Sequence, residues 1–283
     1  MTYSIVARDP KSGELGVAVQ SHWFSVGSIV TWARPGVGAV ATQANAETAY
    51  GPNALALLAD GVPAPEALER LVAADPGGPS RQVAIVDWAG RVGAHTGPTC
   101  IACAGHITGE GVSCQANIMV SERVWPAMLK AFSAASDSSL TLRLLDALDA
   151  AEREGGDLRG RQSAAILVVP AEGEPWRTSV SLRVEDHPEP LPELRRLVAL
   201  HDAYRLAGHT RSETMMFAWQ ETPWPVTCPA QAMHLGPVWA PTRPAASTTA
   251  TCREGLPGSA ATSRSSASGA GTPSASRASA SGP

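Results

Sequence analysis

Short strand-like segments of this sequence come in three groups, and pairs of helix-like segments separate the groups. Alternating or continuous apolar runs predict strands, and apolar residues at helical spacing predict helices. Strands are expected at 2–8, 16–23, 28–34, 37–45, 81–88, 92–97, 109–120, 163–170 and 177–186. Helices are expected at 51–60, 64–74, 122–134, 139–154 and 190–205. Regular strand–helix alternation would predict a parallel sheet, whereas this order predicts an α+β protein. We expect a four-layer αββα sandwich in which two antiparallel sheets pack face to face.

The sequence changes character near Gly208. Residues 1–207 carry clear apolar periodicity and are expected to form one domain. Residues 208–283 hold tryptophans among many prolines, and then mainly Ala, Ser, Thr, Gly, Pro and Arg. Because such a composition cannot bury a core, we expect an irregular, disordered tail. One interpretation is a natural flexible tail, and the other is out-of-frame translation after a frameshift. The abrupt break after a well-formed helix favours the frameshift.

Charge and hydropathy exclude several classes of protein. A net charge of -4 over 283 residues provides no electrostatic reason to bind nucleic acid or an anionic membrane. No segment approaches the roughly 20 apolar residues of a membrane-spanning helix. The opening MTYSIVARDP lacks the basic and apolar regions of a secretory signal. We therefore expect a cytoplasmic protein whose five cysteines are free thiols.

Thr2 is the first candidate for chemistry. Removal of Met1 would expose a residue whose hydroxyl is a nucleophile and whose own α-amine can take the hydroxyl proton. An α-amine has a pKa of about 7.7–8.0, so part of it is neutral near physiological pH. The strand that starts at once would hold this terminus inside a sheet. Most proteins that begin Met-Thr make no use of the threonine, so the position needs support from the rest of the chain.

Several segments resemble the bacterial DUF1028 family, a domain of unknown function. They are residues 1–44, 50–61 (YGPNALALLADG), 95–97 (HTG), 109–119 (GEGVSCQANIM) and 155–169 (GGDLRGRQSAAILVV). The resemblance implies an N-terminal-nucleophile hydrolase-like fold, of the type seen in the proteasome and penicillin acylase. That group cleaves amide-type bonds without a cofactor, and DUF1028 itself implies no particular substrate.

Comparison with proteasome-like hydrolases, by chain order, suggests further roles. They place a carboxylate on the second strand, where this chain has Gln20, Ser21 and His22. They place a lysine on the following strand, where this chain offers Arg34, which stays charged and cannot shuttle a proton. These two departures also favour an alternative, a non-catalytic small-molecule or peptide binding protein on the same scaffold.

Side-chain amides provide candidate donors for an oxyanion. Gln43 and Asn45 end a strand before a helix, and each such donor typically contributes about 2.7–4 kcal/mol in characterised enzymes. The alternative for Asn45 is ordinary turn and cap chemistry. Gln115 and Asn117 alternate on one strand and so share a face. They are expected either to line the space between the sheets or to face solvent.

Two further groups of residues have alternative interpretations. Asp157, in a glycine-rich loop, and Ser163 correspond to an acidic residue and a serine near the proteasome nucleophile, although a simple Asp157–Arg159 contact explains Asp157 equally well. Cys100 and Cys103 form C-x-x-C, which together with a histidine would suit a metal-dependent hydrolase. Without a second such motif, paired free thiols are the better interpretation, and we expect no metal.

The sequence therefore predicts an N-terminal-nucleophile amidohydrolase that forms an acyl-enzyme on Thr2. Asn45 and Asn117 are the expected catalytic amides. The expected substrate-binding residues are Ser21, His22, Arg34, Gln43, Gln115 and Asp157. No cofactor is expected, and the partner is a small-molecule or peptide-like substrate. A homodimer would cover an exposed sheet edge.

Overall fold

Ten strands form two antiparallel sheets in the computed structural model, which describes residues 2–209. Sheet A has six strands in the order β10-β9-β2-β1-β8-β7. Its strands are β1 (Thr2–Arg8), β2 (Leu15–Ser21), β7 (Gly105–Gly109), β8 (Val112–Asn117), β9 (Ser163–Val169) and β10 (Val180–Val184). Sheet B has four strands in the order β3-β4-β5-β6. Its strands are β3 (Thr31–Arg34), β4 (Gly38–Ala44), β5 (Arg81–Asp87) and β6 (Val92–Thr96).

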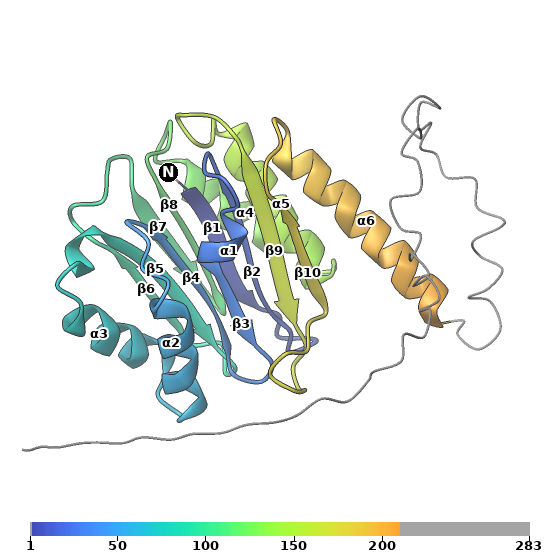
Figure 1. The fold of residues 1–283 in the computed structure, drawn as a ribbon, viewed down its shortest axis with the longest axis horizontal. Helices are drawn as coiled ribbons and strands as arrows, with labels where there is room; N and C mark the ends of the chain where they lie inside the picture. Colours follow the sequence, from blue (N-terminus) through green and yellow to red (C-terminus); the bar gives the residue numbers. More distant parts are fainter. Residues whose placement is uncertain (1, 210–283) are drawn as a thin grey trace, which may run out of the picture. The chain divides into compact units, whose positions relative to one another are not determined.

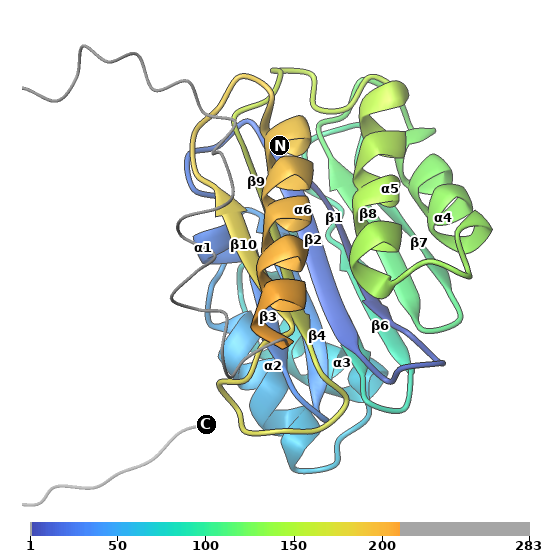
Figure 2. The ribbon, with the colours of Figure 1, turned by 90° about the vertical axis from the view of Figure 1, so that its right-hand side faces the viewer.

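Helices cover the outer faces of both sheets (Figures 1 and 2). The helices are α1 (Gly27–Val30), α2 (Tyr50–Ala59), α3 (Ala64–Ala74), α4 (Val124–Ala134), α5 (Leu140–Arg153) and α6 (Pro190–His209), with a 3-10 turn at Gly78–Ser80. Helices α2 and α3 lie on sheet B, and α4, α5 and α6 lie on sheet A. Residues 2–209 thus form the predicted sequence of layers, namely helices, sheet, sheet and helices.

Strand alternation divides the apolar side chains among three cores. On β1, Tyr3 and Ile5 join the core between sheet A and its helices, whereas Val6 joins the core between the two sheets. A third core lies between sheet B and helices α2 and α3. Because neighbouring strand residues point to opposite faces, Thr2 and Ser4 share the face of Val6. The space between the sheets is therefore apolar around Val6 and becomes polar toward the start of β1.

Helix α5 shows how local sequence signals produce an element of this fold. Ser139 occupies the N-cap, and its hydroxyl accepts a hydrogen bond from the backbone N–H of Leu142. Leu144 and Leu148, four residues apart, are buried against sheet A. Leu142 lies on the outer side and is 41% exposed, so the leucine-rich stretch is only partly a core-facing stripe.

The structure differs from the prediction in two places. Residues 28–34 were expected to be one strand, but Gly27–Val30 is a short helix and the strand begins at Thr31. The helix allows Val26 and Val30, four residues apart, to enter the core between the sheets together. Strand β7 was not predicted, because Ile107 is the only large apolar residue of its five.

The predicted boundary near Gly208 falls at the end of α6. Residues 210–283, most of the segment expected to be irregular, lie outside the described residues. None of the helices within residues 2–209 combines the length and the apolar character that crossing a bilayer requires.

Candidate active site

Four polar residues form a row across the four central strands of sheet A. Register places Thr2 opposite Asn117 on β8 and opposite Ser21 on β2. Ser21 in turn lies opposite Ser163 on β9. All four side chains are buried. The row lies at the end of the sheet where β1 begins, because Thr2 is the first residue of that strand.

Thr2 is held between neutral hydrogen-bonding groups. Its hydroxyl oxygen lies 3.0 Å from the Ser21 hydroxyl. Its backbone carbonyl accepts long contacts of 3.4 Å from Gln43 Nε2 and 3.4 Å from Asn117 Nδ2. Thr2 is 6% exposed, so its hydroxyl is removed from bulk water at the start of a central strand.

Gln82 on β5 joins the amides of both sheets. Its Oε1 accepts 2.7 Å and 2.9 Å hydrogen bonds from Gln43 Nε2 and Asn117 Nδ2. Gln82 is fully buried and was not among the predicted site residues. The sequence signal for Gln82 was a polar amide directly before the apolar run VAIV of β5. An amide on an otherwise apolar strand is the same signal that had selected Gln115 and Asn117.

A second chain of hydrogen bonds runs deeper between the sheets. Ser4 Oγ donates to Gln43 Oε1 at 2.7 Å and accepts from Gln115 Nε2 at 2.6 Å. Ser113 Oγ donates to Gln115 Oε1 at 2.9 Å. Gln115 and Asn117 therefore face the space between the sheets, as one of the two sequence interpretations expected. Asn117 pairs with Thr2, whereas Gln115 pairs with Ser4, two residues further along β1.

Asp157 ties together two loops beside the row. Its buried carboxylate accepts hydrogen bonds of 3.0 Å and 2.9 Å from the backbone N–H groups of His22 and Arg159. The Arg159 guanidinium lies 3.5 Å from the same carboxylate. The Asp157–Arg159 contact considered from the sequence is thus present. The His22 ring is turned to this loop, with Nδ1 3.3 Å from the Arg161 carbonyl.

Two predicted site residues lie outside this cluster. Arg34 pairs with Gly38 at the opposite end of β4 from Gln43. Gln43 lies five positions along the strand from Gly38, which corresponds to roughly 16 Å. Asn45 is exposed, and its amide nitrogen bonds Ser80 Oγ at 3.2 Å. The turn chemistry considered for Asn45 therefore describes its contacts, and Arg34 lies at the far end of β4 from Gln43.

Left-handed backbone conformations occur beside two of the amides that contact Thr2. Within residues 2–209, the non-glycine residues with positive φ are Ser25 (54°), Ala44 (69°) and Ile118 (57°). Ala44 and Ile118 directly follow Gln43 and Asn117. Such conformations are costly and cluster at functional sites, so their location agrees with a site around Thr2.

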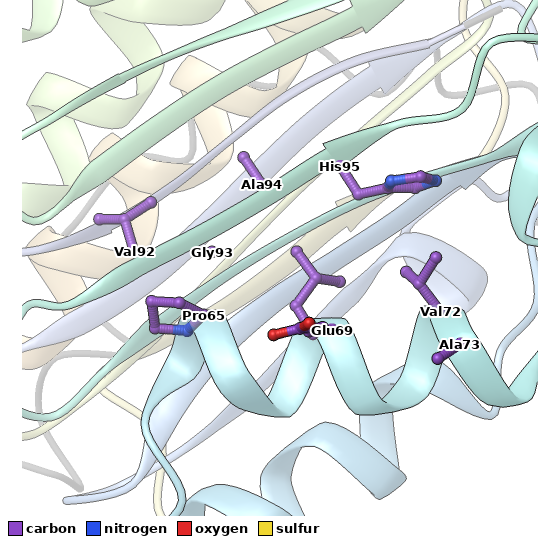
Figure 3. Close-up of a pocket in the computed structure, with 9 residues that line it drawn as sticks. Pro65, Glu69, Val72, Ala73, Val92, Gly93, Ala94 and His95 are labelled. Atoms are coloured by element: carbon purple, nitrogen blue, oxygen red, sulfur yellow. The ribbon is translucent and has the colours of Figure 1, made fainter.

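Two surface grooves lie away from Thr2. One, of about 520 Å³, lies between α3 and β6, with Glu69 and His95 among its lining residues (Figure 3). The other, of about 560 Å³, is lined by α1, β9 and β10 and includes Trp32 and Arg183. Neither groove contains a residue of the row, so the grooves do not define the candidate site.

The C-x-x-C motif lies on the loop between β6 and β7. Cys100 Sγ contacts the Arg81 carbonyl, and burial raises the pKa of the Cys100 thiol, which disfavours the thiolate. Cys100 and Cys103 are free thiols. Within residues 2–209, no three His, Cys, Asp or Glu side chains lie close enough to hold a metal ion. This part of the chain therefore offers no ligand set for the metal-dependent alternative.

The resemblance to DUF1028 is tested by comparison with known protein families. Residues 2–194 match the Family of unknown function (DUF1028). This chain belongs to the DUF1028 family. The resemblance inferred from the sequence is thus confirmed, and it covers all ten strands described above.

A solved structure from the same family resembles this chain. The crystal structure of protein SPO2555 from Silicibacter pomeroyi, also described as DUF1028, is 34% identical and has a TM-score of 0.63. The similarity covers 70% of this chain and 88% of that one. No curated protein matches this sequence. Anbu (ancestral beta-subunit) from Yersinia bercovieri has 14% identity, 72% and 96% coverage and a TM-score of 0.33. That likeness is too low to support an argument about fold or activity.

Proposed function

We propose that this DUF1028 protein is an N-terminal-nucleophile hydrolase that cleaves an amide-type bond through an acyl-enzyme on Thr2. The observation that carries the proposal is the position of Thr2. It begins a central strand, is almost fully buried, and has its hydroxyl 3.0 Å from a second hydroxyl. The layered arrangement of two antiparallel sheets with helices outside supports an N-terminal-nucleophile hydrolase-like fold.

The proposed reaction begins once Met1 has been removed. Thr2 Oγ1 attacks the substrate carbonyl carbon while the α-amine of Thr2 accepts the hydroxyl proton. The tetrahedral intermediate collapses when the same amine returns the proton to the leaving nitrogen, which breaks the C–N bond. Water then adds to the ester on Thr2 by the same route and releases the acid. The amine suits both steps because its ordinary pKa of about 7.7–8.0 is close to neutral pH.

Neutral amides are the proposed stabilisers of the oxyanion. Gln43 and Asn117 each have a short hydrogen bond to Gln82, and their other contacts are long, 3.4 Å from each amide to the Thr2 carbonyl and 3.4 Å from Gln43 to the Gln115 carbonyl. The second N–H of each amide is therefore weakly engaged and available to a developing negative charge. Ser21 takes the place that a carboxylate holds in proteasome-like enzymes. The substrate is proposed to be a small-molecule or peptide-like amide. The cytoplasmic location and the homodimer stay predictions.

Labelling of the terminal threonine tests the proposal. Intact-mass analysis of untagged protein should show loss of Met1, and a β-lactone probe should then add to Thr2. Thr2→Ala should lose labelling completely, whereas Thr2→Ser should retain part of it because the hydroxyl remains. Retained Met1, or a probe adduct that persists in Thr2→Ala, would refute the mechanism.

A second function is favoured by the neutral amides and hydroxyls beside the nucleophile. Thr2 contacts Ser21, Gln43 and Asn117, which are uncharged hydrogen-bonding groups. A binding protein could use the same groups to recognise a peptide-like amide without cleaving it. Such a protein would bind but would not form an adduct with the β-lactone, so the same labelling experiment separates the two functions.

A further inference from the structure

The side-chain amide of Gln82 has a fixed orientation. Its Nε2 lies 2.9 Å from the Ala116 carbonyl oxygen, 3.1 Å from the Gly105 carbonyl oxygen and 2.9 Å from Thr96 Oγ1. A carbonyl oxygen cannot donate a hydrogen bond, so the nitrogen of Gln82 must occupy this side. Reversing the amide would place Oε1 against two carbonyl oxygens. The oxygen of Gln82 is consequently directed to the other side, toward Gln43 and Asn117.

This oxygen sets the orientation of two further amides. It accepts hydrogen bonds from Gln43 Nε2 at 2.7 Å and from Asn117 Nδ2 at 2.9 Å. Both amides must therefore present nitrogen, and not oxygen, to the region beside Thr2. Gln43 is held from its other end as well, because its Oε1 accepts from Ser4 Oγ. The three amides form one buried network that spans sheets A and B.

We propose that Gln82 is a positioning residue, whose carbonyl oxygen orients the Gln43 and Asn117 amides so that their N–H groups face Thr2. The inference rests on the proposed function of Thr2 as nucleophile. Gln82 acts through the two amides and does not itself meet the reacting atoms. Pre-oriented donors are effective because they need no reorganisation as charge develops.

Gln82→Leu removes the acceptor while retaining similar volume. The maximal rate of β-lactone labelling at Thr2 should fall about tenfold or more, and at most by the roughly 10²- to 10³-fold seen when an oxyanion donor is lost outright. The probe concentration for half-maximal rate should stay within about twofold, because the amides are needed after binding. The matched control is Gln20→Leu. Gln20 is equally buried, faces the helix side of sheet A, and its amide atoms have no hydrogen-bond partner among the described residues. This control should label at the wild-type rate.

Gln82→Glu provides a readout that a purely structural role would not produce. In this variant an ionised carboxylate would face the Gly105 and Ala116 carbonyl oxygens, and burial would raise the pKa of the new carboxyl group. Its protonated form can donate to one of these carbonyls, as the amide does. The labelling rate relative to wild type should therefore rise as pH falls from about 8 to about 5.5. This direction is opposite to that expected for the α-amine, which loses base function as pH falls.

The possible results separate the inference from the proposed function. A wild-type protein that never labels at Thr2 would remove the proposed function and the positioning role together. A reactive wild type with an equally reactive, folded Gln82→Leu variant would overturn the positioning role alone. If Gln82→Leu does not fold, Gln82→Glu decides the question, and a pH-independent ratio to wild type would overturn the inference. Side-chain amide exchange of Gln43 and Asn117 by NMR should be slow in wild type and faster in Gln82→Leu, which lacks the acceptor.

Discussion

At the residue scale, Ser21 places a neutral hydroxyl beside Thr2, where a carboxylate at the same position would place a negative charge. The Ser21 hydroxyl can orient Thr2 Oγ1 across 3.0 Å, but at neutral pH it cannot hold a negative charge beside the α-amine. A hydroxyl therefore does not raise the pKa of the amine as a carboxylate in its place would.

Ser21→Ala measures what this hydroxyl contributes. A hydrogen bond of this kind is typically worth about 0.5–1.5 kcal/mol, which corresponds to roughly two- to tenfold in rate. We expect Thr2 labelling to slow by that factor while the variant stays folded. Ser133→Ala, at an exposed position on α4, is the control for serine removal. An unchanged rate in Ser21→Ala would show that Ser21 does not assist Thr2.

Much of the candidate site follows from alternation along single strands. The sequence predicted Thr2, Ser21, Gln43, Gln115 and Asn117, and the structure gathers them between the sheets. The local signal for Gln82, a glutamine on an apolar strand, was passed over, and its partners Gln43 on β4 and Asn117 on β8 are recorded by no local pattern. Arg34 was expected near Thr2 by chain order, and Asn45 as an amide at the turn from β4 toward α2. Chain order does not reveal which end of a strand a residue occupies once the strand is paired.

At the element scale, Asp75 joins the end of α3 to β5 and α2. Its carboxylate accepts hydrogen bonds from the Arg81 guanidinium at 2.8 Å and from the Tyr50 hydroxyl at 3.1 Å. The Arg81 hydrogen bond, followed by the Gly77 backbone N–H, lowers the pKa of Asp75 to about 2. Burial, with help from Asp75, raises the pKa of Tyr50 to about 12.

The depressed pKa of Asp75 predicts a pH dependence of stability. A carboxyl whose pKa is lower in the folded state stabilises the fold above its unfolded pKa, and that contribution is lost as pH falls. For Asp75 the loss should occur between about pH 4 and pH 2. Asp75→Asn should therefore be less stable than wild type at pH 6, and the two melting temperatures should converge toward pH 2. Parallel melting curves over that interval would show that Asp75 does not stabilise the fold.

Secondary structure was predicted best where the apolar period is long. Helix α5 and the β1–β2 hairpin are clear in the sequence because their core-facing residues repeat at regular spacing. Short elements behave differently. Helix α1 has only four residues, and β7 has a single large apolar residue at a sheet edge. Tertiary contacts decide the conformation of such segments, and a periodic pattern cannot show this in advance.

At the scale of the whole molecule, the described cores draw only on the first two hundred residues. Their buried members run from Tyr3 to Val198. We expect a chain that ends at His209 to melt within about 2 °C of the full chain, a difference below roughly 1 kcal/mol for a domain of this size. Calorimetry on both chains provides the measurement. A fall of several degrees would show that residues beyond 209 stabilise the domain.

The two sheets are joined by different forces at their two ends. Around Val6 the contact is apolar, and around Thr2 it is a hydrogen-bonded set of amides and hydroxyls. Polar contacts depend more on geometry than apolar ones do, so the polar end specifies how the sheets align. The sequence predicted that two sheets would pack, but it did not reveal their alignment, which is set by hydrogen bonds that cross between the sheets, from Ser4 to Gln43 and from Asn117 to Gln82.

The start of β1 between two other strands has a practical consequence for anyone who purifies this protein. An affinity tag fused ahead of Thr2 turns the amine into a peptide nitrogen, whose lone pair is delocalised and takes no proton. Under the mechanism proposed above, such a preparation would be inert toward every candidate amide. Screening for a substrate therefore requires material whose purification handle is attached at the carboxyl end.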